Sequence, residues 1–286
     1  MGREQWPGRA SGRLSGMTVL VTGATGNIGR MVVDHLLAAG ATDVRALTID
    51  PRRAALPERV EVVRGSLRKV DALPAVLDGV DRMYLAPIPE MAQDVVAAAG
   101  RAGVRHIVDL SGEPQSWWGA VAVAVESFGG TWTHLWPGDF MENSLVWARQ
   151  IRATGTVREP WPAAASTPVA MDDIAAVAAV ALLQDGHGGR AYSITGPEIL
   201  SRVDLVRLIA AAVGRPIRFV EATRDETVAE LSPAMGDNAS WYVDNVLAAM
   251  TSWPQPPTRT VEQVTGRPAT TFADWSTRNA DAFGAE

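Results

Sequence analysis

The sequence contains no cysteine, and this absence excludes several kinds of chemistry. Disulfide bonds, thiolate nucleophiles and cysteine-ligated metals are all ruled out, and the composition fits a reducing, cytoplasmic compartment. The four histidines, at positions 35, 106, 134 and 187, lack the spacing of metal ligands, so no metal site is expected. No apolar run is long enough to span a bilayer, and we expect no membrane association.

The sequence also lacks an excess of basic over acidic residues. The chain of 286 residues carries a formal net charge of −6, and no run of Lys or Arg stands out. Nucleic-acid binding needs a basic face, so this class of partner is not expected. Apolar residues make up 47% of the chain and charged residues 20%, which indicates a globular protein with a large core. Residues 1–16 lack the apolar segment of a signal peptide, and we expect a flexible tail there.

The stretch from Thr18 to Arg30 predicts a strand, a phosphate-binding loop and a helix. An apolar, β-branched run leads into three glycines spaced as G-x-x-G-x-x-G. The first glycine allows a tight exit from the strand, the second keeps a side chain out of pyrophosphate space, and the third lets helix and strand pack closely. Unpaired N–H groups at the start of the helix favour phosphate. The pattern therefore indicates dinucleotide binding, the alternative being a glycine turn needed only for packing. The expected contacts are Gly23, Thr25, Gly26, Asn27, Ile28 and Gly29.

Strand-like segments alternate with helical ones through the first half of the chain. Such alternation implies right-handed βαβ units and a parallel sheet that is covered on both faces. We therefore predict an α/β fold with a doubly wound Rossmann sheet and a smaller C-terminal α/β substrate lobe. The Rossmann domain is expected over residues 17–145, completed by about 168–197, and the lobe over 146–167 and 198–286.

The C-terminal part contains three pairs with the spacing of a helix-capping box. They are Ser201 with Asp204, Thr223 with Glu226, and Thr271 with Asp274. In this arrangement a hydroxyl caps the first turn of a helix, so we expect helices to begin at these positions. Gly214 is placed to end the first of them.

Several motifs together resemble the NmrA-like group of atypical short-chain dehydrogenases. They are Val-Thr-Gly-Ala-Thr-Gly-Asn-Ile-Gly at 21–29, Val-Arg-Ala-Leu at 44–47, Gly-Val-Arg-His-Ile-Val at 103–108 and, most specifically, the stretch 132–143, which is similar to the family pattern T-x-L-R-P-x-x-F-M-E-N. The resemblance covers nearly the whole chain after Met17. It implies a Rossmann fold that binds NADP(H). Some members reduce quinones, azo dyes or iminium ions and others are dinucleotide-sensing regulators, so enzyme and sensor both remain open.

The end of the second strand bears on the choice between NADPH and NADH. Where the family usually has an arginine for the ribose 2′-phosphate, this chain has Ile49. Arg52 and Arg53 either supply that charge or form only a solvated helix start. No Asp or Glu stands at 46–49 to bind a 2′-hydroxyl, which favours NADP(H). Further cofactor contacts are expected at Ser66, Leu67, Ala86, Pro87, Ser111 and Pro137.

The Tyr-x-x-x-Lys pair of ordinary short-chain dehydrogenases is missing. Ala122 and Glu126 stand about where that pair belongs. Ser111 ends the fifth strand, where the resemblance places a hydroxyl or backbone group toward the nicotinamide, although it could equally cap the next helix. Ser111, Glu126 and His134 are our candidates for catalysis. The alternatives are a carboxylate paired with an arginine and a histidine packed in the core.

Aromatic side chains gather near the ends of the fifth and sixth strands, where doubly wound sheets bind their ligands. Two adjacent tryptophans beside Gly and Pro suggest a wall for a flat, apolar substrate, and core packing accounts for part of the group. The expected substrate contacts are Trp117, Trp118, Trp136, Phe140, Met141 and Asn143.

Together these features predict an NADPH-dependent reductase of a small apolar or aromatic acceptor, acting as a monomer or homodimer. Without a phenol acid, quinone-like or iminium-like acceptors are expected rather than simple ketones, because these acceptors need no strong proton donor. The alternatives are a non-catalytic NADP(H)-binding sensor and a redox-neutral enzyme of aromatic secondary metabolism on the same fold.

Overall fold

The computed structural model describes residues 16–252 and 254–284. The tail expected over 1–16 therefore lies outside the described residues, except for Gly16. The chain divides into two compact units. The first holds the described residues up to 137, together with 171–194 and 260–267, and the second holds the others. No helix in the described part of the chain is long and apolar enough to cross a membrane.

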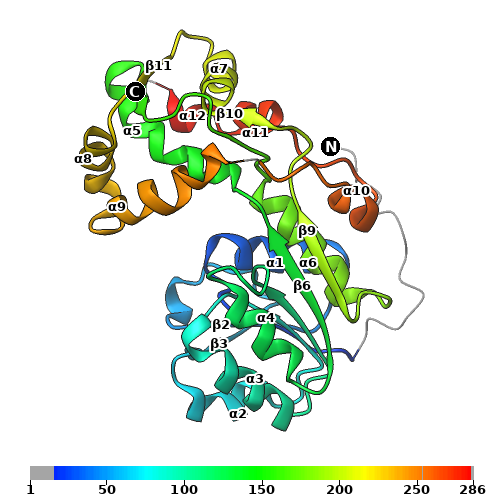
Figure 1. The fold of residues 1–286 in the computed structure, drawn as a ribbon. Coiled ribbons are helices and arrows are strands. Elements are labelled where there is room, and N and C mark those ends of the chain that lie inside the picture. The colour runs from blue at the N-terminus through cyan, green and yellow to red at the C-terminus, as the bar shows by residue number, and fades with distance from the viewer. Residues whose placement is uncertain (1–15, 253, 285–286) are drawn as a thin grey trace. The chain divides into compact units, whose positions relative to one another are not determined.

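The first unit is built on a seven-stranded sheet with the order β3-β2-β1-β4-β5-β6-β9 (Figure 1). The strands are β1 (Val19–Val21), β2 (Val44–Thr48), β3 (Glu61–Arg64), β4 (Arg82–Leu85), β5 (His106–Leu110), β6 (Thr131–Pro137) and β9 (Arg190–Ile194). Every neighbouring pair is parallel. The order reverses between β1 and β4, which defines a doubly wound sheet. The predicted Rossmann fold is confirmed.

Helices cover both faces of this sheet (Figure 1). The helices α1 (Asn27–Ala38) and α6 (Met171–Leu183) pack against each other on one face. The helices α2 (Leu73–Leu77), α3 (Ala92–Arg101) and α4 (Gly119–Glu126) share a core cluster with β1, β2, β4 and β5 on the other. Short 3-10 helices follow β2 (Pro51–Arg53), β3 (Val70–Ala72) and β4 (Pro89–Met91). In the sequence, α1 begins only a short loop after the end of β1.

The second unit is mainly helical. Its helices are α5 (Ala148–Thr154), α7 (Arg202–Val213), α8 (Arg224–Met235), α9 (Asn238–Tyr242), α11 (Phe272–Arg278) and α12 (Ala280–Phe283), with a 3-10 helix at Met141–Trp147. Two small sheets pair β8 (Ala165–Ser166) with β10 (Leu200–Ser201) and β7 (Thr156–Glu159) with β11 (Arg218–Glu221). Its core contains the large aromatic side chains Trp147, Phe272, Trp275 and Phe283.

The division differs from the expected one at two places. The helix α10 (Thr260–Thr265) belongs to the first unit because it packs against α6, although residues 198–286 were expected to belong to the lobe. The first continuous segment of that unit ends at Pro137 rather than at 145. The assignment of one unit to the cofactor and the other to the substrate stays a prediction.

The helix starts expected from the capping pairs are confirmed. The side chain of Ser201 accepts from the N–H of Asp204 at the start of α7, and Thr223 accepts from Glu226 at the start of α8. Thr271 likewise accepts from Asp274 at the start of α11. Gly214 ends α7 with a φ of +75°, a left-handed conformation that glycine adopts without steric cost.

A buried ion pair stabilises the second unit. Glu159 is 0% exposed and Arg202 is 2% exposed. The Nε and Nη2 groups of Arg202 donate to Oε2 of Glu159 at 3.0 and 2.7 Å. The indole N–H of Trp147 donates to Oε1 at 2.6 Å, and the guanidinium lies 4.4 Å from the centre of that ring. Both charges are thus compensated by neighbouring groups of the same unit.

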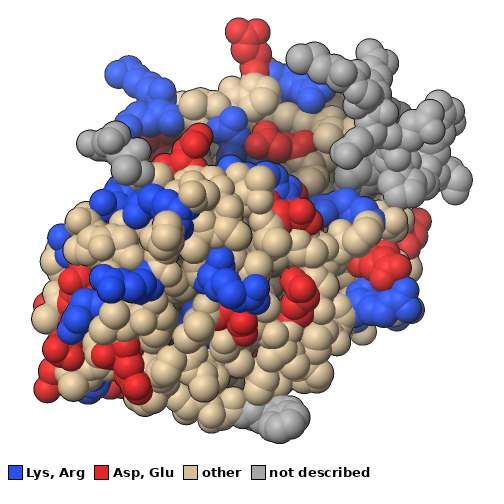
Figure 2. All heavy atoms as spheres, turned by 90° about the horizontal axis from the view of Figure 1, so that it is seen from above, with Lys and Arg blue, Asp and Glu red and all other residues tan. Residues whose placement is uncertain are grey.

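Basic and acidic side chains are mixed on the surface. On the face shown in Figure 2, Lys and Arg residues lie among Asp and Glu residues instead of forming one continuous basic area. Among the residues that the structure describes, no three His, Asp or Glu side chains are grouped so that they could hold a metal ion.

Candidate cofactor and active site

The expected cofactor contacts follow the strands of the parallel sheet one after another. The glycine loop follows β1, the pair Arg52 and Arg53 follows β2, and Ser66 and Leu67 follow β3. Ala86 and Pro87 follow β4, Ser111 follows β5, and Pro137 is the last residue of β6. Because adjacent strands run parallel, their carboxyl ends lie along one edge. The structure therefore brings all of these positions to the same edge of the sheet, around the point between β1 and β4 where ligands bind in such folds.

At two of the three glycines, a side chain would clash with neighbouring atoms of the structure. Gly23 has a φ of +60°, and a Cβ there would come within 2.9 Å of the Ala86 Cβ. A Cβ on Gly29 would meet the backbone oxygen of Gly23 at 2.2 Å, a distance that no rotamer can relieve. These two positions fix the loop tightly against the start of α1.

Gly26 has a different place in the loop. A Cβ there would lie 3.2 Å from the Gly23 oxygen, a tight contact that a small shift relieves. Gly26 is the N-cap of α1 and provides no side-chain cap, and the first turn contains no acidic residue. The first N–H groups of the helix are thus left for an anion. Gly23, Thr25, Gly26 and Asn27 are exposed, whereas the Ile28 side chain is buried and only its backbone faces the loop.

A threonine that the sequence analysis did not single out holds the loop in place. The hydroxyl of Thr22 donates to the carbonyl of Tyr84 at 2.9 Å and accepts from the N–H of Ala86 at 2.8 Å. It thereby ties the end of β1 to the end of β4, the two strands that border the topological switch point. This hydroxyl fixes the distance between the glycine loop and the Ala86-Pro87 segment.

The ends of β2 and β3 enclose a hollow of about 570 Å³. Among the described residues it is lined by Ile49, Asp50, Pro51, Arg52 and Arg64, and Arg53 is not part of the lining. Arg64 was missed by the sequence analysis because it enters the site through strand pairing, in register with Thr48. Asp50 accepts from the backbone N–H of Arg52 at 3.2 Å and so holds the turn that presents this arginine.

The ends of β5 and β6 bring together polar side chains that are buried. Ser111 is 6% exposed, and its hydroxyl has no hydrogen-bond partner within the described parts of the chain. The imidazole Nδ1 of His134 lies 2.6 Å from Oδ2 of Asp109, and both residues are 0% exposed. The His134 Nε2 lies 3.5 Å from Oε1 of Glu126. Within residues 16–252 and 254–284, Glu126 thus lies beside His134 and forms no ion pair with an arginine.

Asp109 was not recognised in the sequence because it lies inside an apolar strand. Burial raises the pKa of its carboxyl group, while the hydrogen bond from His134 and the nearby Ser111 hydroxyl act in the opposite direction. The pKa of Tyr84 is raised as well, first by burial and then by the charge of Asp109. A proton is therefore held more readily in this pocket than on an ordinary carboxylate.

The expected substrate contacts are divided between the two units. Trp117 and Trp118 precede α4 and are 70% and 45% exposed. Trp136 is half-buried, and its indole nitrogen finds no hydrogen-bond partner among the described residues. In the second unit, Met141 is buried in the core and Phe140 is half-buried beside Val169. Asn143 donates to Asp139 at 2.7 Å. The aromatic wall stays a prediction.

The sheet order, the glycine loop and the open start of α1 define a dinucleotide-binding protein of the Rossmann class. A family model described as NAD(P)H-binding matches residues 23–156. The chain belongs to the NAD(P)H-binding, NmrA-like group of atypical short-chain dehydrogenases/reductases, a family of NAD(P)H-dependent oxidoreductases.

Individual relatives support this assignment. The chain is 37% identical to a (4-alkanoyl-5-oxo-2,5-dihydrofuran-3-yl)methyl phosphate reductase of Streptomyces griseus, over 94% of this chain and 100% of the relative. It is 35% identical to an NAD(P)H azoreductase of Xenophilus azovorans, over 93% and 99%. The fold is similar to that of a Citrobacter triphenylmethane reductase complexed with NADP(H), with a TM-score of 0.83, 20% identity, and coverage of 92% of this chain and 100% of that one.

Proposed function

We propose that the protein is an NADPH-dependent reductase that passes hydride to a small apolar or aromatic acceptor of the quinone or iminium type. The observation that carries this proposal is the sheet edge, where the glycine loop, the hollow with Arg52 and Arg64, and Ser111 follow neighbouring parallel strands. Two relatives of more than 30% identity are named as reductases of a furanone phosphate ester and of azo compounds, which supports a reductase with an activated acceptor.

The residues present fit a dinucleotide along this edge. The exposed backbone of Gly26 and Asn27 would take the pyrophosphate at the positive end of α1. Arg52 and Arg64 would hold the ribose 2′-phosphate, because guanidinium groups match phosphate geometry. NADPH supplies a hydride when bound, and we expect its nicotinamide to point toward the end of β5 and Ser111. A cytoplasmic location and a monomeric or dimeric state stay predictions.

The acceptor class follows from the missing phenol and lysine. Hydride transfer to a ketone builds negative charge on one oxygen, and a positioned acid contributes roughly 10²- to 10⁴-fold to such steps. A quinone spreads the incoming charge over its ring, and an iminium carbon loses a charge instead of gaining one. The buried hydroxyl of Ser111 orients such an acceptor but is too weak an acid for a simple ketone.

The test of this function is NADPH oxidation with a panel of quinones, iminium-type dyes and simple ketones. We expect steady turnover with the first two groups and little with ketones. Efficient ketone reduction would contradict the acceptor class. Tight NADPH binding without turnover on any acceptor would instead favour the sensor, and conversion of an aromatic metabolite without net oxidation of NADPH would favour the redox-neutral enzyme.

The preference for NADPH is expected to depend on Arg52 and Arg64. Replacing both with alanine should weaken NADPH binding by about 1.5 to 3 kcal/mol, the usual range for hydrogen bonds to charged groups, and leave NADH nearly unchanged. Arg53→Ala is the matched control, since Arg53 is exposed nearby but outside the lining of the hollow. Dissociation constants for the two cofactors measure the effect. Equal losses for NADPH and NADH would show that the pair acts structurally.

A further inference from the structure

Four polar side chains follow one another from the ligand edge of the sheet to the surface. Ser111 and Asp109 are two positions apart in the chain. The backbone between them is extended, because the N–H of Ser111 donates to the carbonyl of Leu135 at 3.0 Å and continues the hydrogen bonding between β5 and β6. Side chains two positions apart point to the same face. His134 is paired in register with Asp109, and Glu126 reaches the imidazole from α4, which covers this face.

The burial of these groups changes along the series. Ser111, Asp109 and His134 are buried, whereas the Glu126 side chain is 51% exposed. Water thus reaches the outer end of the series, and the inner end lies beside the expected nicotinamide position. The Asp109 Oδ1 and the Ser111 hydroxyl, two positions apart on one face, both lack hydrogen-bond partners among the described residues. The Ser111 hydroxyl is close enough to the Asp109 carboxyl group to lower its pKa.

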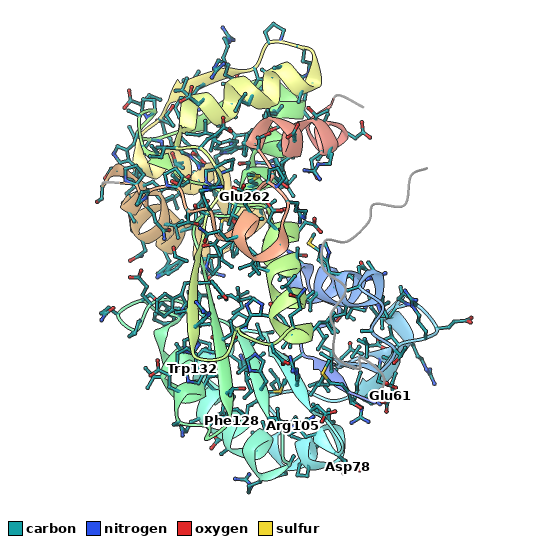
Figure 3. The ribbon with its side chains drawn as sticks, turned by 90° about the vertical axis from the view of Figure 1, so that its right-hand side faces the viewer. Glu61, Asp78, Arg105, Phe128, Trp132 and Glu262 are labelled. Carbon is teal, nitrogen blue, oxygen red and sulfur yellow. The ribbon has the colours of Figure 1, made fainter. Side chains whose placement is uncertain are left out.

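Two tryptophans hold the imidazole between them. Trp132, which is labelled in Figure 3, stacks on His134 with a centroid distance of 4.1 Å and an interplanar angle of 17°. Trp136 stacks on the other side at 6.0 Å and 7°. The rings cover the two faces of the imidazole, and its Nδ1 is hydrogen-bonded to Asp109. Its Nε2 has no hydrogen-bond partner among the described residues and lies 3.5 Å from Oε1 of Glu126. This geometry suits proton transfer in the plane of the imidazole, in at one nitrogen and out at the other, and not through its stacked faces.

The surrounding charges keep the Asp109-His134 pair able to hold a proton. The titratable groups that face it are Tyr84 on β4, Glu126 on α4 and the neighbouring hydroxyl of Ser111. No arginine or lysine forms an ion pair with Asp109 within residues 16–252 and 254–284 that would fix it as a permanent carboxylate. Passing a proton between Oδ2 of Asp109 and Nδ1 of His134 moves no net charge out of the buried pair, which avoids the cost of an isolated buried ion.

We propose that Ser111, Asp109, His134 and Glu126 form a proton relay that delivers a proton to the delocalised anion of a reduced acceptor such as a quinone. The proposal rests on the reductase function proposed above. With NADPH bound, a C–H bond of its nicotinamide would break and the hydride, with both electrons of that bond, would form a new bond to the acceptor, so that the acceptor would be reduced and NADPH oxidised to NADP⁺. The Ser111 O–H bond breaks as the anionic acceptor atom gains its proton. Asp109 then returns a proton to Ser111, His134 returns one to Asp109, and water at Glu126 returns one to His134.

The relay is therefore needed only by acceptors that take a proton as well as a hydride, such as quinones. A cationic triphenylmethane dye is the matched probe, because it takes hydride alone and needs no proton. In this mechanism Ser111 contacts the acceptor, and Asp109, His134 and Glu126 act through it as positioning residues.

The test compares Asp109→Asn and Glu126→Gln with the wild type on these two probes. We expect kcat with the quinone to fall about tenfold or more, with KM nearly unchanged, and kcat with the dye to stay the same. The solvent deuterium isotope effect on the quinone reaction and its pH profile should change in the variants. Glu113→Gln is the matched control, because this carboxylate is exposed in the segment before α4 and outside the relay. Equal losses on both probes, or no loss on either, would overturn the proposal.

A second measurement needs no cofactor. In the cofactor-free protein, infrared spectroscopy should show a protonated carboxyl band that persists above the pH at which ordinary carboxyl groups ionise, that is lost in Asp109→Asn and that shifts in His134→Gln. Absence of this band in the wild type would overturn the relay even if Asp109→Asn folds poorly. Failure of the reductase function is separate, because it would appear as wild-type protein that oxidises NADPH with neither probe.

Discussion

Replacing Gly26 with aspartate is expected to abolish dinucleotide binding and to leave the first unit folded. The new carboxylate would occupy pyrophosphate space at the start of α1 and repel its charge. Gly26 has no left-handed φ, and its Cβ would meet the Gly23 oxygen at a distance that a small shift relieves. We expect NADPH affinity to fall at least about 100-fold, which corresponds to roughly 2.7 kcal/mol. Quenching of tryptophan fluorescence measures binding, and thermal unfolding measures the fold.

Two further variants of the loop separate charge from steric effects. Gly26→Ala adds the methyl group without the charge and should lose much less affinity than the aspartate. Gly29→Ala should lose both binding and thermal stability, because its Cβ would lie 2.2 Å from a backbone oxygen. Unchanged NADPH affinity in Gly26→Asp would show that the loop serves packing alone.

Glu159→Gln is expected to be the most destabilising single change in the second unit. It would leave the Arg202 guanidinium, only 2% exposed, without a countercharge. Removing one partner of a buried pair typically costs about 3 to 5 kcal/mol, because the remaining charge can no longer reach water. Urea unfolding of the variant and the wild type gives the difference in free energy of unfolding.

An exposed pair of the same unit is the control for this prediction. Arg149 and Glu230 are 2.9 Å apart, with side chains that are 61% and 31% exposed. Glu230→Gln should change the free energy of unfolding by less than about 1 kcal/mol, as surface pairs usually do. The double variant Glu159→Leu with Arg202→Met should lose less than Glu159→Gln alone, since it leaves no uncompensated charge. A loss below that of Glu230→Gln would refute a stabilising role of the buried pair.

The sequence was sufficient wherever the signal is local. The glycine spacing predicted the loop, the alternation of segments predicted the sheet, and the hydroxyl and carboxylate pairs predicted the starts of α7, α8 and α11. Each of these depends on residues within a few positions of one another.

The residues that were missed enter the site through strand pairing. Arg64 reaches the hollow because β3 is in register with β2, and Asp109 meets His134 because β5 is in register with β6. Neither strand register can be derived from the sequence alone. In the sequence, Asp109 is only a single polar residue within an apolar strand. The contact of Glu126 with His134 has the same origin, since it depends on the packing of α4 over β6. Residue type alone does not give these contacts.

The division of the chain has a consequence for its synthesis on the ribosome. The chain changes unit five times, after residues 137, 170, 194, 259 and 267. Neither unit is therefore a continuous product of translation. The outer edge of β6 has no neighbouring strand until β9 emerges at 190–194, and α10 joins the first unit only after residue 265 has been made. Until then the nascent chain exposes an unpaired strand edge, the feature that most readily recruits another chain. We expect chaperone dependence of this protein to be greatest during that interval of translation.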